Sequence, residues 1–267
     1  MNLNYFELKD KNNLTNRLFK LSFSKESLPF KSVIIPIGFP TLTYIYNERK
    51  ISITKDAKQK LKGLIITGQH YRAYDFMMKN EGLICGIEFH PTAFYKIFKT
   101  DASTISNKHI KLSTIDKKKS KKFLDIFLMY QNDEDLFIKK MLDFLESLEL
   151  YNGKDVKEID KAIHLILKKE GMLQISDLLN VIPFSQKTLE TKFKKIIGFT
   201  PGRYIRLVRF TSLMKKYETG TIDLKTLMYD YNYYDESHLK KDFKRFLNKT
   251  PNAYFKKNYP LIKKYLQ

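Results

Sequence analysis

From Leu189 the sequence reads L-E-T-K-F-K-K-I-I-G-F-T-P-G-R-Y-I, and from Leu239 it reads L-K-K-D-F-K-R-F-L-N-K-T-P-N-A-Y-F. The two stretches start 50 positions apart, and the residues that constrain local structure recur in the same order. Gly198 corresponds to Asn248, and after one intervening residue each of them is followed by a Thr-Pro pair. Such a repeat is typical of one structural unit that is present twice.

Each copy carries the start and stop signals of a helix that is followed by a second helix. Ser185 and Asp235 are good N-caps, and Gly or Asn at the far end tolerates a left-handed turn. The spacing therefore predicts helices over 186–197 and 236–247. Proline at the first helical position after a capping hydroxyl then predicts a long linking helix over Pro201 to Tyr217.

A shorter apolar segment precedes each of these capped helices. Ser176 is expected to cap a helix over 177–181, and Asp223 is expected to cap one over 224–231. A turn of about three or four residues then leads to the next helix, which is the spacing of a helix-turn-helix. The sequence predicts an all-α C-terminal domain over 151–267 with two helix-turn-helix units.

Residues from about 155 to 257 resemble the C-terminal DNA-binding domain of the AraC family (AraC/XylS type) of bacterial transcription regulators. The resemblance rests on S-Q-K-T-L-E-T-K-F-K-K-I-I-G-F-T-P-G-R-Y-I-R-L-V-R-F from Ser185 and on L-M-Y-D-Y-N-Y-Y-D-E-S-H-L-K-K-D-F-K-R-F-L-N-K-T-P-N-A-Y-F from Leu227. It implies that 186–197 and 236–247 are recognition helices in successive major grooves, about 34 Å apart. It also implies double-stranded DNA and RNA polymerase as partners.

The same resemblance assigns roles to single residues. The expected base contacts are Lys187, Glu190, Thr191, Ser237, His238 and Lys241. Their chemistry is suitable, because lysine donates to guanine, glutamate accepts from cytosine and threonine contacts the thymine methyl. The expected DNA backbone contacts are Lys194, Lys195, Thr200, Arg203, Lys240, Lys244 and Thr250.

Four positions depart from the family pattern. Where the family usually has alanine in the helix before the turn, this chain has Leu179 and Met228, and the usual turn glycines are Pro183 and Asn232. Asparagine still permits a left-handed conformation, whereas proline fixes φ near −65°. We expect a repacked core and an altered first turn in the same fold.

The charge is strongly basic, with 49 Lys and Arg against 29 Asp and Glu and a net charge of +20. Residues 151–267 hold 24 basic and 12 acidic side chains, a net charge of +12, whereas residues 1–150 hold 25 and 17, a net charge of +8. The shorter segment is the more basic, as a DNA-binding domain should be. By itself this charge fits a solvated basic surface equally well.

The first 150 residues predict a β-rich sensory or dimerisation domain with two trailing helices. Strand-like runs are followed by amphipathic stretches over 119–130 and 134–151, which serve either as a dimer surface or as a cover for the core. The expected strands are 33–37, 42–46, 51–53, 64–67 and 83–89. The segments from Gly38, Ile66 and Gly86 resemble the small, cupin-like β-barrel that precedes the DNA-binding part in many AraC-type regulators, with a small-molecule effector and a second copy of the chain as candidate partners.

Catalysis and metal binding find little support in the sequence. His70, Glu88 and His90 are too dispersed for a convincing metal site, and the single Cys85 excludes an internal disulfide and a cysteine-rich zinc site. We expect no enzyme activity and no cofactor. No signal peptide or apolar run of 18 residues is evident, so we expect a cytoplasmic protein without a membrane span.

The sequence thus predicts a sequence-specific transcription regulator, and it leaves the effector, the operator and the sign of regulation open. The alternative is a metabolite-binding or interaction module whose basic half binds nucleic acid without sequence preference. Selection from random DNA separates the two, since only the regulator enriches two boxes about one helical turn apart.

Overall fold

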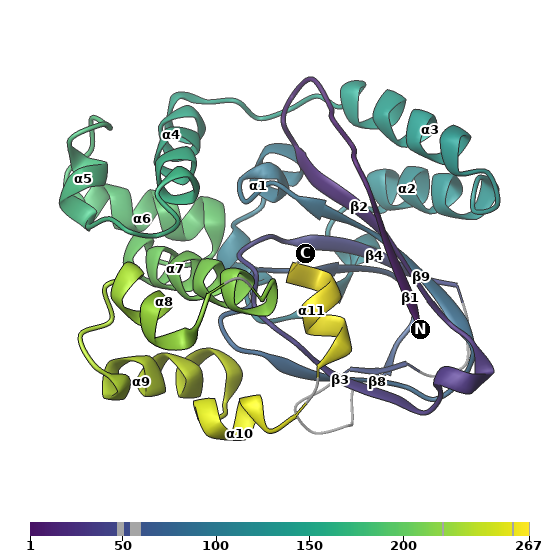
Figure 1. The fold of residues 1–267 in the computed structure, drawn as a ribbon. Helices are drawn as coiled ribbons and strands as arrows, with labels where there is room; N and C mark the ends of the chain where they lie inside the picture. The colour runs from purple at the N-terminus through teal and green to yellow at the C-terminus, as the bar shows by residue number, and fades with distance from the viewer. Residues whose placement is uncertain (47–50, 54–59, 221, 258, 267) are drawn as a thin grey trace.

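The computed structural model describes residues 1–46, 51–53, 60–220, 222–257 and 259–266. A β-rich N-terminal part is followed by a helical part that packs against one end of it, and the last helix returns to lie over the strands (Figure 1). None of the described helices is long and apolar enough to cross a membrane.

The N-terminal part consists of two antiparallel sheets. The six-stranded sheet has the order β1 (Asn2–Phe6), β2 (Thr15–Phe23), β9 (Gly82–Phe89), β4 (Thr41–Ile45), β7 (Gly63–Thr67) and β10 (His109–Lys111). The four-stranded sheet has the order β3 (Phe30–Ile34), β8 (Tyr74–Met78), β5 (Ile51–Ile53) and β6 (Lys60–Leu61). Across the described ranges no strand ladder joins the two sheets, so the predicted β-rich, cupin-like domain is an open barrel.

Each strand predicted from the sequence corresponds to a strand of the structure within a few residues, but several strands were missed. The longest, β2, was missed because both of its faces are covered and polar residues therefore do not alternate with apolar ones. Its Leu18 packs outward toward the helices, whereas Leu21 and Phe23 pack between the sheets. The missed strand β8 carries Phe76 into the same space between the sheets.

Three helices of this part cover the outer face of the six-stranded sheet. They are α1 (Ala93–Phe98), α2 (Lys117–Met129) and α3 (Glu134–Glu146). Phe123 and Phe127 of α2 and Phe137 of α3 pack in one core with Leu42 and Ile87 of the sheet. The two predicted amphipathic helices are confirmed, and they cover the core of this part.

The helical part contains the predicted elements. Its helices are α4 (Lys154–Lys168), α5 (Ile175–Leu179), α6 (Gln186–Ile197), α7 (Pro201–Glu218), α8 (Leu224–Asp230), α9 (Glu236–Leu247), α10 (Pro251–Phe255) and α11 (Pro260–Leu266). The predicted bounds 186–197 and 236–247 coincide with α6 and α9. The predicted linking helix is α7, one residue longer than expected.

The caps explain why those bounds were predictable. The side chains of Ser185 and Asp235 accept hydrogen bonds from the main-chain nitrogens of Thr188 and His238. At the far ends Gly198 has φ 96° and Asn248 has φ 57°, both left-handed. These helices therefore begin and end where local side chains satisfy the free main-chain groups.

The starts of α5, α8 and α7 differ in how they are capped. The expectation that Ser176 caps α5 is wrong, because Gln174 is the N-cap and forms a capping box with Asp177. Asp223 caps α8 as predicted. Thr200 precedes Pro201 at the start of α7, but its hydroxyl makes no cap hydrogen bond.

The two parts are joined by direct contacts. The main-chain nitrogen of Ala73 donates to the oxygen of Phe246 at 2.6 Å, and the hydroxyl of Ser106 donates to the oxygen of Gly198 at 3.0 Å. Val33 and Ile35 of the β part lie in the same hydrophobic cluster as the helical core. Each helix-turn-helix unit is thus anchored to the β part at the C-terminal end of its second helix.

Candidate nucleic-acid interface

The long helix α7 holds α6 and α9 on either side of it (Figure 1). The ring of Phe193 in α6 lies 5.7 Å from that of Tyr204 in α7. On the other side, the ring of Phe210 in α7 lies 5.3 Å from that of Phe243 and 4.8 Å from that of Phe246 in α9. Aromatic packing of this kind fixes the two capped helices relative to one another.

The outward face of α6 is basic. Lys187, Lys194 and Lys195 are exposed. Thr191 is exposed too, but its hydroxyl donates to the main-chain oxygen of Lys187 at 3.0 Å, which leaves its methyl group as the free part. Glu190 is half-buried and accepts a hydrogen bond from the exposed Gln186 at 3.1 Å.

The outward face of α9 is similar, with one difference. Ser237, Lys240, Lys241 and Lys244 are exposed, and Lys240 pairs with Glu236 at 2.9 Å. His238 is half-buried, with its ring 4.9 Å from that of Tyr233. Burial first, and the nearby charge of Arg209 second, lower the pKa of His238. This histidine therefore offers a neutral ring that is partly used in packing.

Some of the expected backbone contacts also touch the β part. The guanidinium of Arg203 lies 5.5 Å from the ring centre of Tyr71, and the Lys195 ammonium lies 5.8 Å from that of Tyr95. Thr200 is half-buried, whereas the hydroxyl of Thr250 accepts from the main-chain nitrogen of Ala253. Arg203 and Lys195 therefore lie where the helical and β parts meet.

A buried carboxylate in α9 was not predicted from the sequence. Asp242 is 0% exposed and accepts hydrogen bonds from Arg245 at 2.7 Å and from the hydroxyl of Tyr233 at 3.1 Å. Arg206 and Arg209 of α7 approach it at 3.9 and 3.7 Å. The sequence contains a signal for this buried carboxylate, because position 242 lies on the apolar face of the helix, which carries Leu239 and Phe243.

Two exposed tyrosines of the second unit were also missed. Tyr234, directly before the N-cap of α9, is 95% exposed, and Tyr229 at the end of α8 is 84% exposed. Large aromatic side chains are ordinarily at least partly buried. The position of Tyr234 directly before α9 extends the candidate interface to the turn of this unit.

The residues weighed as a metal site have other partners. Glu88 pairs with Arg17 at 2.9 Å, and the ring of His70 lies 4.8 Å from that of His109. His90 is 3.0 Å from the Thr92 hydroxyl. In the described part of the chain no three His, Cys, Asp or Glu residues come together as a metal site. Burial raises the pKa of the Cys85 thiol to about 11, so this thiol is not an activated nucleophile.

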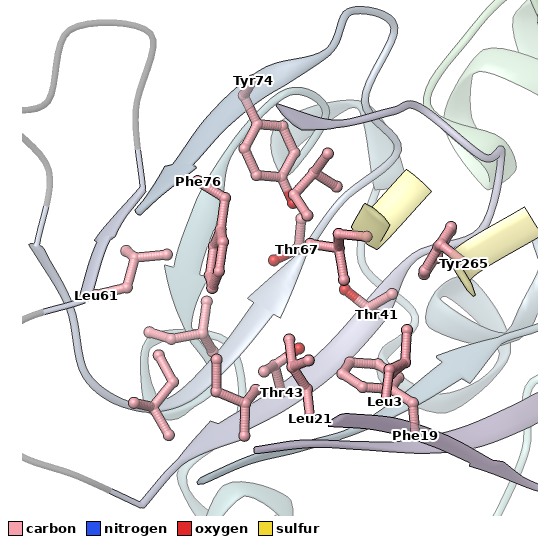
Figure 2. A pocket seen from close by; sticks show the side chains of 15 residues that line it. Leu3, Phe19, Leu21, Thr41, Thr43, Leu61, Thr67, Tyr74, Phe76 and Tyr265 are labelled. Atoms are coloured by element: carbon pink, nitrogen blue, oxygen red, sulfur yellow. The ribbon is translucent and has the colours of Figure 1, made fainter. Parts of the chain in front are cut away.

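A second candidate site is a cavity of about 100 Å³ between the two sheets (Figure 2). Side chains from both sheets line it, and Leu261 and Tyr265 of α11 close one side. Its polar groups are the hydroxyls of Thr41, Thr43, Thr67, Tyr74 and Tyr265. The other lining residues are apolar, so no charged side chain of the described residues lines this cavity.

Comparison with known proteins agrees with this architecture. A helix-turn-helix domain family matches residues 178–257, and a family described as a domain of unknown function (DUF6597) matches residues 16–111. No curated protein matches the chain. Fold and match together define a two-part DNA-binding regulator. The double helix-turn-helix that this match covers is of the AraC type and lies at the C-terminal side of the chain.

Among solved structures, ToxT from Vibrio cholerae resembles the chain over most of its length. The structure of ToxT from strain O395 is 12% identical, covers 88% of this chain and 95% of its own, and has a TM-score of 0.48. Wild-type ToxT from strain SCE256, bound to an unsaturated fatty acid, is also 12% identical. It covers 89% of this chain and 92% of its own, with a TM-score of 0.47.

Proposed function

We propose that this protein is a sequence-specific transcription regulator that reads two successive major grooves with α6 and α9. One observation carries the proposal: two helices with matching caps present basic outward faces and are both fixed to the rigid helix α7. Two recognition helices held by one connector suit half-sites about one helical turn apart.

Within this proposal, the exposed Lys187 near the start of α6 and the exposed Lys241 of α9 are the main base readers. Glu190, Thr191, Ser237 and His238 complete the reading faces. Lys194, Lys195, Arg203, Lys240 and Lys244 neutralise phosphates, and Thr200 and Thr250 bring helix N-termini to the backbone. The exposed hydroxyl of Tyr234 is well placed to donate to a phosphate beside α9.

We assign regulation to residues 1–150 and DNA binding to residues 151–267. The cavity between the sheets supports a sensory role for the first segment. Leu128 and Met129 of α2 are exposed at 45% and 70%, which supports pairing of two chains through α2. Sedimentation of the full chain with Met129→Glu tests that pairing: a dimer that the substitution dissociates supports it, and a wild-type monomer contradicts it.

Selection of bound sequences from random double-stranded DNA tests the regulator directly. We expect the full chain to enrich two short boxes whose centres are about 10 base pairs apart. Lys187→Ala should relax preference in one box only, and Lys241→Ala in the other. Recovery of DNA without any enriched motif would favour the alternative of a nonspecific basic module.

A further inference from the structure

The cavity between the sheets is chemically selective because its polar groups are all hydroxyls. Thr67 Oγ1 lies 3.0 Å from Nδ1 of His109, and burial lowers the pKa of that imidazole to about 4. The ring is therefore neutral at physiological pH, and the described lining offers no charge to pair with a carboxylate or an ammonium group. A buried charge without a partner is costly, so this lining suits an uncharged molecule.

The size of the cavity sets a second constraint. Its volume of about 100 Å³ is smaller than the roughly 150 Å³ cavity that holds benzene in another protein. A molecule of about the size of benzene or larger therefore enters only if part of the wall moves.

The wall that no strand ladder holds in place is α11. The strands around the cavity are held by continuous ladders to their neighbours. By contrast, in the described part of the chain one hydrogen bond joins the β part to the α11 main chain, from Nη2 of Arg17 to the oxygen of Tyr265 at 2.8 Å. The Arg17 guanidinium also lies over the rings of Tyr5 and Tyr265, 3.7 and 5.1 Å from their centres.

This wall is also part of the DNA-binding half. Leu261 packs in the core between the sheets, whereas Ile262 and Leu266 pack in the core of the helical part. Directly before α11, the ring of Tyr259 stacks on that of Tyr254 in α10 at 5.0 Å. The hydroxyl of Tyr254 donates to Glu218 at the end of α7, so α11 is connected to the helix that carries both recognition helices.

We propose that the cavity binds an uncharged, largely apolar small molecule and that α11 is the wall which this molecule displaces. The proposal rests on the regulatory role given above to residues 1–150. Entry of the molecule removes Leu261 and Tyr265 from the cavity and with them withdraws Ile262 and Leu266 from the helical core. Occupancy of the cavity thereby changes how α7 is supported.

Calorimetric titration of the full chain with 1-octanol and with octanoate tests the class of ligand. The two probes share their chain and differ in charge. We expect 1-octanol to bind at least about ten-fold more tightly than octanoate, because the lining leaves the carboxylate without a partner. Equal binding of the two probes, or no measurable binding of 1-octanol, overturns the assignment of the ligand.

Amide hydrogen exchange of the same samples tests the moving wall. We expect 1-octanol to speed exchange in residues 260–266 by at least about five-fold and to leave α5 unchanged. Binding of 1-octanol with unchanged exchange in residues 260–266 overturns the role of α11.

Two variants of α11 form a matched pair. Leu261→Ala removes the contact with the sheets and should raise the affinity for 1-octanol about ten-fold, whereas Lys263→Ala, exposed on the same helix, should not change it. Ile65→Phe, which fills the cavity from β7, should abolish binding and keep the exchange of residues 260–266 at the wild-type rate. If Leu261→Ala and Ile65→Phe both bind 1-octanol like the wild type, the cavity is not the site.

The outcome for DNA separates this inference from the proposed function. A full chain that enriches a DNA motif but binds no 1-octanol overturns the inference alone. A chain that binds 1-octanol and displaces α11 but enriches no motif leaves the inference standing and overturns the function as a sequence-specific regulator.

Discussion

The hydroxyl of Tyr204 donates a hydrogen bond to the main-chain oxygen of Gly38, 3.0 Å away, across the boundary between the helical and β parts. Gly38 has φ 82°, and a Cβ atom at this position would lie 3.3 Å from the Tyr204 ring. Tyr254, the equivalent tyrosine of the second repeat, bonds instead to Glu218 within the helical part. The same repeat position thus makes a hydrogen bond to the β part in the first unit and a hydrogen bond within the helical part in the second.

Tyr204→Phe should lower the free energy of unfolding by about 1–2 kcal/mol, because the buried Gly38 oxygen loses its partner. Urea unfolding of the full chain measures the change. Tyr217→Phe is the control, since no hydrogen bond of the Tyr217 hydroxyl is found in the described residues, and it should change the free energy by less than about 0.5 kcal/mol. Equal effects of the two substitutions would contradict a role for this hydrogen bond.

Lys187→Ala and Lys241→Ala should each weaken binding to the selected DNA site by about 1–3 kcal/mol and relax base preference locally. Arg203→Ala should instead weaken binding to all sequences alike and lower the salt slope by about one unit. Binding measured at several salt concentrations on matched and mutated sites tests both. Unchanged affinity and preference in the two lysine variants would show that the base readers lie elsewhere.

Stability should fall in mild acid because of the stacked histidines. Burial lowers the pKa of His70 to about 3 and that of His109 to about 4, against an ordinary value near 6.5. As the pH falls from about 6.5 to 4, His70 and His109 bind protons in the unfolded chain but stay neutral in the folded chain. The stabilisation is therefore complete above about pH 6.5 and is lost by roughly 1.4 kcal/mol per pH unit for each histidine.

His70→Phe separates this effect from packing, because it keeps a ring against Tyr74 and His109 and removes a buried nitrogen that has no hydrogen-bond partner. The variant should be about as stable as the wild type at pH 7.5 and lose less stability at pH 5. Urea unfolding at both pH values measures the slope. A slope equal to that of the wild type would mean that His70 does not titrate in this range.

Arg17→Ala should destabilise the full chain by about 3–5 kcal/mol, because it leaves the Glu88 carboxylate, which is 0% exposed, without its cation. The double variant Arg17→Met with Glu88→Gln should recover part of that loss, since the buried charge is removed as well. Thermal unfolding of the three proteins decides this. A double variant less stable than Arg17→Ala would mean that the ion pair is not the main source of the cost.

The helical half was predictable because its signals are local. Caps at Ser185 and Asp235 and left-handed ends at Gly198 and Asn248 lie within each helix's own turn, so no distant contact was needed to place α6 and α9. Asp242 was assigned no role because its three arginine neighbours come from two helices, and their meeting depends on how α7 and α9 pack.

The β half and the cavity were less accessible to sequence reasoning. A strand with both faces covered, such as β2, has no alternation to detect. Leu261 and Phe76 lie in one hydrophobic cluster although they are nearly two hundred positions apart, and no local pattern encodes this packing. No sequence signal assigns the last helix to the wall of an N-terminal cavity.

The bond between Arg17 and the Tyr265 oxygen joins residues near opposite ends of the chain. During synthesis, residues 260–266 emerge after every strand that they cover, so the sandwich exists for a time as a nascent fold with an open side. An uncharged molecule present in the cell would meet that open side before α11 arrives. Binding during synthesis, as well as later exchange of the small molecule with the folded protein, would then determine which chains contain it.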